Sequence, residues 1–66
     1  MDETDVLSAK LAILEQQHRD LDNAIEALEV QPLRDELQIK RLKKRKLSLR
    51  DNIYFIIDQL NPDFSA

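Results

Sequence analysis

Apolar residues recur along the first half of the chain at alternating intervals of four and three, which is the spacing of a packed helix. The row consists of Leu7, Leu11, Leu14, His18, Leu21, Ile25 and Leu28. Neither proline nor glycine interrupts it. A heptad row with a single polar member predicts a helix over about residues 4–30 that packs along one side, with Thr4 as its N-cap.

A second row with the same spacing occupies the C-terminal half of the chain. Its members are Ile39, Leu42, Lys46, Leu49, Ile53, Ile56 and Leu60. Pro32 separates the two rows, because proline disfavours a helical residue before it and fits well as the first residue of a new helix. We therefore expect a turn at residues 31–32 and a second helix over about residues 33–60. Asn61 and Pro62 should stop this helix, and residues 61–66 are expected to form a loose tail.

The short connection favours a single domain of the all-α class, an antiparallel two-helix hairpin in which the two rows form one seam. The predicted register places Leu7 opposite Ile56, Leu14 opposite Leu49, and Ile25 opposite Ile39. His18 and Lys46 then share a polar layer that fixes this register. Protonation of His18 beside Lys46 is expected to loosen the hairpin. A parallel dimer through the first helix, with the second helix splayed away, is the alternative architecture.

Charge is distributed unevenly between the two halves. Residues 1–30 contain eight acids and two bases, whereas residues 40–50 contain seven bases and no acid. The pairs predicted beside the seam are Glu15 with Arg50, Asp22 with Lys43, and Glu29 with Glu36. The first two pairs are attractive and the third is repulsive. Exposed pairs contribute only ~0.2–1 kcal/mol each, so they select the orientation of the helices more than they stabilise it.

Two motifs carry a resemblance to a known family. They are His18-x-x-Leu21-Asp22-x-x-Ile25 and Leu42-Lys43-Lys44-Arg45-Lys46-Leu47-x-Leu49-Arg50-Asp51-x-Ile53. Over about residues 14–57 the chain resembles the YdcH-like proteins, small bacterial proteins of unknown function, although the family pattern has lysine at Arg50 and glutamate at Asn52. The resemblance implies a helical hairpin in a bacterial cytoplasm and implies no activity. SlyX-like proteins are a more distant comparison, and the chain lacks their proline-rich ending.

Several large apolar residues lie outside the two rows. The predicted interaction surface consists of Val6, Ile13, Leu47, Tyr54, Phe55 and Ile57. A lone hairpin would expose these side chains, and contiguous apolar patches usually mark a partner surface. A core of this size contributes roughly 3–5 kcal/mol, so small chains commonly gain further burial by association. We therefore expect a homodimer that forms a four-helix bundle, or an unidentified protein partner.

A cluster of bases offers an alternative function. Lys40, Arg41 and Lys44 point outward from the second predicted helix, and Arg45 flanks the seam. These four bases are candidate contacts for nucleic acid or another polyanion. The net charge of −3 and the lack of an aromatic residue within residues 40–50 favour instead a solvated helix face.

The residue inventory argues against an enzyme. The chain contains no cysteine, no glycine and one histidine, which removes thiol nucleophiles, phosphate-binding glycine loops and histidine-rich metal sites. His18 and Asp22 have the spacing of one edge of a metal site, but we expect a polar layer there and no metal or cofactor. The prediction is a non-catalytic module for protein–protein interaction or assembly.

The chain begins Met1-Asp2-Glu3, which resembles neither a secretory nor a mitochondrial leader. Its longest apolar run, residues 53–57, is far shorter than the ~20 residues of a membrane-spanning helix. We therefore expect a cytoplasmic protein without membrane contact.

Overall fold

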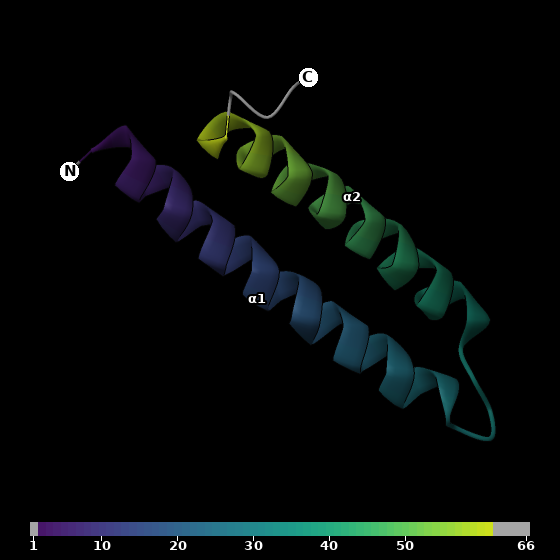
Figure 1. Ribbon diagram of the computed structural model, residues 1–66. Coiled ribbons are helices and arrows are strands. Elements are labelled where there is room, and N and C mark those ends of the chain that lie inside the picture. Colours follow the sequence, from purple (N-terminus) through teal and green to yellow (C-terminus); the bar gives the residue numbers. More distant parts are fainter. Residues whose placement is uncertain (1, 62–66) are drawn as a thin grey trace.

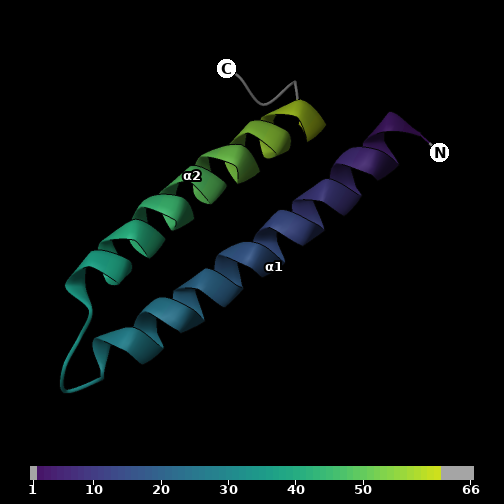
Figure 2. The ribbon, with the colours of Figure 1, turned by 180° about the vertical axis from the view of Figure 1, so that it is seen from behind.

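The computed structural model describes residues 2–61 and shows two long helices. Helix α1 spans Glu3–Glu29 and helix α2 spans Glu36–Leu60. The helices run antiparallel, side by side, and are joined at one end by residues 30–35 (Figures 1 and 2). The predicted all-α helical hairpin is therefore confirmed, and the two apolar rows meet between its helices.

Helix α1 begins before the predicted cap. Asp2, and not Thr4, is its N-cap, with an extended backbone at φ −70° and ψ 151°. The backbone N–H of Val6 donates to the carbonyl of Asp2 at 3.1 Å, which closes the first helical turn. Glu3 and Asp5 lie in this turn, where the helix dipole favours negative charge. The side chain of Asp2 makes no capping hydrogen bond.

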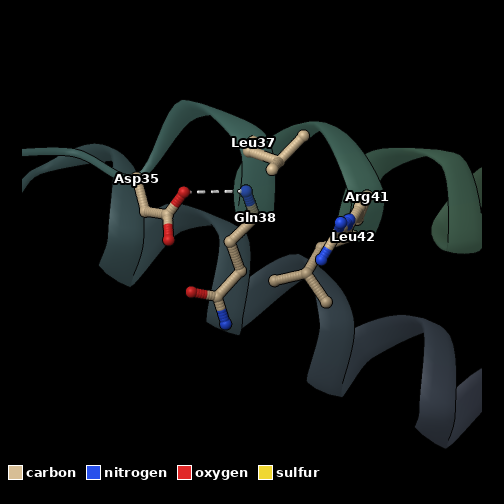
Figure 3. A pocket seen from close by; sticks show the side chains of 5 residues that line it. All are labelled: Asp35, Leu37, Gln38, Arg41 and Leu42. Atoms are coloured by element: carbon tan, nitrogen blue, oxygen red, sulfur yellow. Dashed lines mark hydrogen bonds between the residues drawn. The ribbon is translucent and has the colours of Figure 1, made fainter.

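Helix α2 begins at Glu36, three residues later than the predicted start at residue 33. Asp35 is its N-cap: the backbone N–H of Gln38 donates to the Asp35 carboxylate at 3.0 Å, as Figure 3 shows. The backbone N–H of Ile39 donates to the Asp35 carbonyl, also at 3.0 Å. A side-chain cap of this kind satisfies a free N–H of the first turn, whereas Pro32 only permits a helix start. The connection is consequently longer than the predicted turn.

Asn61 ends helix α2 by bonding back to its last turn. The backbone N–H of Asn61 donates to the Ile57 carbonyl at 3.0 Å, and the side-chain amide donates to the same oxygen at 3.3 Å. The helix therefore stops at Leu60, where the sequence predicts. The rest of the predicted tail, residues 62–66, lies outside the described residues.

The seam contains every position of the two predicted rows. All fourteen are buried or half-buried, and among the other described residues only Glu29 and Ile57 share this protection. Ile25, Ile39 and Ile56 are the most buried, at 4%, 3% and 8% exposed. The molecule is only 14 Å thick. Each row is therefore covered only by the opposite helix, and solvent can reach its side chains from both sides of the hairpin.

The register differs from the prediction by about one helical turn. Asp22 contacts Lys46 and Glu29 contacts Lys43, whereas the predicted partners were Lys43 and Glu36, both earlier in α2. The physical reason lies in the spacings of the rows. When the row of α1 is read forward and the row of α2 backward, both have the intervals 4, 3, 4, 3, 4, 3. All six intervals coincide only when Leu7 faces Leu60.

This corrected register also accounts for burial at the ends of the seam. It places Leu28 opposite Ile39, and it gives Leu60 a partner in Leu7. Leu28 and Leu60 had no partner in the predicted register, yet both are half-buried. Lys46 becomes level with Leu21, next to Asp22, which matches the observed contact.

No helix within residues 2–61 has the length and hydrophobicity to span a bilayer.

Candidate interaction surfaces

The hairpin is a flat molecule of 47 × 28 × 14 Å, so it has two broad faces. We call the first the charged face; its groove is lined by Glu15, His18, Arg19, Asp22, Arg50, Ile53 and Tyr54. We call the second the amide face; its two grooves are lined by Leu7, Lys10, Leu14, Asn52, Phe55, Ile56 and Gln59, and by Gln17, Asp20, Leu21, Arg45 and Leu49. At 3.6 residues per turn, these two sets project from opposite sides of the seam.

The charged face contains the ion pairs that join the helices. Lys46 Nζ lies 2.7 Å from Asp22 Oδ1, and Lys43 Nζ lies 3.0 Å from Glu29 Oε2. A third pair, Arg34 with Glu36 at 2.6 Å, is local to the connection and the start of α2. These pairs are partly or fully exposed, so each contributes little to stability. Their main effect is to select one register.

Asp22 lies between two cationic or potentially cationic groups. The hydrogen bond from Lys46 lowers the pKa of the Asp22 carboxyl, and the charges of Lys46 and then His18 lower it further. The corrected register places Lys46 level with Leu21 and His18 level with Leu49, so the two residues of the predicted polar layer lie at successive levels of the seam, and Lys46 bonds to Asp22. Residues 2–61 contain no group of three side chains placed to hold a metal ion.

Arg50 contacts its own helix across one turn. Its guanidinium lies 5.9 Å from the centroid of the Tyr54 ring, within the range of a cation–π contact. Glu15 lines the same groove as Arg50, but none of the three ion pairs found in residues 2–61 joins them. The predicted pair of Glu15 with Arg50 is therefore not formed, as the change of register requires.

The amide face has a different chemistry. The floor of its grooves consists of Leu7, Leu14, Leu21, Leu49 and Ile56. Amide side chains and a few charges surround this floor: Gln17, Asn52 and Gln59, with Lys10, Asp20 and Arg45. None of these three charged residues belongs to an ion pair within residues 2–61. The grooves on this side therefore have an apolar floor of seam residues with few charges around it.

The predicted interaction surface does not form a single patch. Five of its members are exposed: Val6, Ile13, Leu47, Tyr54 and Phe55, at 41%, 58%, 52%, 57% and 64%. Ile57 is half-buried. Tyr54 lines the charged face whereas Phe55 lines the amide face. Consecutive residues of a helix point about 100° apart, so these two side chains serve different surfaces.

Three further apolar residues are exposed at the closed end of the hairpin. Val30, Leu33 and Leu37 are 77%, 93% and 59% exposed. Leu37 lines a groove at the start of α2 with Asp35, Gln38, Arg41 and Leu42 (Figure 3). The sequence reading missed this cluster because it placed Leu33 at the start of the second helix. Asp35, two residues after Leu33, could have indicated the later start of the helix, because aspartate is a strong N-cap residue.

The four predicted polyanion contacts lie along one stretch of α2. Lys40, Arg41, Lys44 and Arg45 are all exposed. None of them belongs to the three ion pairs of residues 2–61, whereas Lys43 and Lys46 do. The sequence therefore separated these four bases from Lys43 and Lys46, which join the helices. It paired Lys43 with Asp22, whereas Lys43 contacts Glu29.

The fold and its surfaces define a class: small proteins built from one antiparallel helical hairpin, with ion pairs that join the helices along one side of the seam. The model of a family described as proteins of unknown function, DUF465, matches residues 11–57. Because this match covers most of the chain, the protein belongs to that family, which is the YdcH-like family indicated by the two sequence motifs. Comparison with curated proteins and with solved structures gives no match.

Proposed function

We propose that this protein is a non-catalytic, cytoplasmic module for protein–protein interaction and assembly, and that it self-associates into a four-helix bundle. The observation that carries the proposal is the balance of apolar exposure. Eight large apolar side chains are exposed, and only three apolar residues are buried, among those the structure describes. A small chain with so few buried apolar residues commonly gains further burial by association.

The thinness of the hairpin supports the same proposal. A residue in the core of a domain is covered from all sides, but each seam residue here is covered by one helix. Leu14, Leu21 and Leu49 remain half-exposed as a result. Packing a second layer of helices on one face would bury these leucines, with a gain of roughly 25 cal/mol per Å² of apolar surface.

The proposal of a non-catalytic role rests on the groups that the grooves contain. The one histidine of the chain lies beside Asp22 and Lys46, in a groove open to solvent. No cysteine is present, and no glycine loop is available to cradle a phosphate.

The experiment is a measurement of mass in solution over a range of concentrations, by sedimentation equilibrium. We expect a species of twice the chain mass of 7.7 kDa, with dissociation on dilution. A monomer at every concentration, together with no protein recovered by affinity purification from cytoplasm, would contradict the proposal. Fractionation of cells that contain a tagged chain tests the location.

Binding of a polyanion is the second candidate function. The observation in its favour is that the four exposed bases Lys40, Arg41, Lys44 and Arg45 take no part in the ion pairs of residues 2–61. If these bases bind nucleic acid, affinity falls steeply with salt, and the slope decreases when bases are removed.

A mobility shift with duplex DNA and with RNA tests this candidate. Lys40→Glu/Lys44→Glu should weaken binding and reduce its salt dependence. Arg19→Glu, an exposed base on α1, is the matched control and should have a much smaller effect. Absence of binding by the unchanged protein at low salt would remove the candidate.

A further inference from the structure

We infer that the amide face is the surface on which a second copy of this chain docks, across a two-fold axis near the middle of α1. In this arrangement Lys10 faces the partner's Asp20. The inference rests on the proposed self-association and deepens it, because it assigns the interface to one of two faces.

The grooves of the two faces differ in the seam residues that form their floor. On the amide face the floor consists of four leucines and an isoleucine: Leu7, Leu14, Leu21, Leu49 and Ile56. On the charged face the seam residues that line the groove are His18 and Ile53. A second layer on the amide face therefore covers more apolar surface of the seam.

Covering the charged face would remove many ionised groups from water. The charged face holds the Lys46–Asp22 and Lys43–Glu29 pairs, and its groove is lined in addition by Glu15, Arg19 and Arg50. Burying ionised groups is unfavourable unless each is fully paired and hydrogen-bonded. The grooves of the amide face contain three charges, Lys10, Asp20 and Arg45, among amide and apolar side chains. Covering this face therefore removes fewer charges from water, and two of the three gain a partner in the arrangement proposed here.

The charges of the amide face are complementary to those of a second copy of the same face. Lys10 and Asp20 are ten residues apart on α1, or about 15 Å at ~1.5 Å per residue. A two-fold axis midway between them places each lysine opposite the partner's aspartate, so the contact forms twice. Asp20 is bonded only to its own helix, through Gln16 at 2.9 Å, among the contacts described.

The size of the face is sufficient. A standard interface buries roughly 800 Å² on each partner. The molecule extends 47 Å by 28 Å in the plane of its broad faces, which leaves room for an interface of this size. Ile13, between Lys10 and Gln17 along the same side of α1, is 58% exposed in one chain and lies where such an interface would have its centre.

The test compares matched substitutions on the two faces. Ile13→Glu places a charge on the amide face, and Leu47→Glu places one on the other side of the hairpin, seven residues before Tyr54. The two side chains are similarly exposed, at 58% and 52%, so both variants should fold, which circular dichroism checks. We expect Ile13→Glu to raise the dimer Kd about tenfold or more, and Leu47→Glu to leave it within about threefold of the unchanged protein.

A charge exchange tests the two-fold arrangement. Lys10→Glu and Asp20→Lys should each weaken the dimer, because each places like charges opposite one another. The double variant Lys10→Glu/Asp20→Lys should restore the Kd of the unchanged protein. If Lys10 and Asp20 act only within one chain, the double variant should lose as much affinity as the two single variants together. That result would overturn the arrangement.

The outcomes separate this inference from the proposed function. If the unchanged chain is monomeric, this inference and the proposed self-association both fail, and affinity purification from cytoplasm then tests whether the chain binds another protein. If it is a dimer that Leu47→Glu dissociates and Ile13→Glu does not, the interface lies on the charged face; the inference is then wrong while self-association stands.

Discussion

Lys46 is a seam residue whose charge lies outside the seam. Its side chain is 33% exposed, and its ammonium reaches Asp22 on the neighbouring helix at 2.7 Å. A lysine stem can pack along apolar neighbours while its charged end remains hydrated. A cation is therefore tolerated in the leucine row, and its bond to Asp22 favours this register.

This contact makes stability depend on pH in a defined direction. The hydrogen bond from Lys46 holds the pKa of Asp22 below its ordinary value of 3.8. The unfolded chain therefore takes up this proton first as pH falls. The stabilisation is complete above the ordinary value and is lost as pH falls through the lower pKa of the folded state.

We expect Asp22→Asn to be less stable than the unchanged protein at neutral pH, and the difference to shrink between about pH 5 and pH 2. Thermal unfolding followed by circular dichroism measures this. Glu26→Gln, which alters an exposed acid one turn away, is the control and should not show the same convergence. A difference between Asp22→Asn and the unchanged protein that stays constant down to pH 2 would contradict the assignment.

At the scale of the element, the two helices begin in different ways. Asp35 accepts a hydrogen bond from the first turn of α2, whereas the side chain of Asp2 makes no such bond at the start of α1. The start of α2 determines where the connection ends, and with it how the second row meets the first. This cap explains why Leu33 is 93% exposed: it precedes the helix.

We expect Asp35→Ala to destabilise the protein by about 1 kcal/mol, within the ~0.5–2 kcal/mol typical of an N-cap. Asp2→Ala should have a smaller effect, because it removes only a favourable charge at the helix end. Urea unfolding at one protein concentration compares the two variants. Equal losses would show that the capping bond of Asp35 is not what fixes the start of α2.

At the scale of the whole molecule, the decisive quantity is the register of the two rows. Matching the intervals of the two rows places Leu14 level with Ile53, and the ion pairs are shifted in the same direction; the predicted register placed Leu14 opposite Leu49. The prediction aligned the rows from a two-residue turn and so mismatched their intervals of four and three. The correct alignment was available in the sequence, because only one pairing matches all the intervals.

Disulfide formation distinguishes the two registers. We expect the pair Leu14→Cys/Ile53→Cys to oxidise within one chain faster than the pair Leu14→Cys/Leu49→Cys, since a disulfide needs Cα atoms within about 7 Å. Rates are compared at low protein concentration by mass spectrometry after thiol blocking. Faster closure of the Leu49 pair would restore the predicted register, and crosslinks between chains alone would favour the parallel dimer.

The sequence by itself determined the two helices, the bend between them and the identity of all fourteen seam residues. These follow from local rules: the heptad period selects the face that packs, and Pro32 and Asn61 mark the breaks. The tertiary structure alone decided which of the off-seam residues share a face. Tyr54 and Phe55 are neighbours in sequence but lie on opposite broad faces, because a face exists only once the second helix is in place to define it.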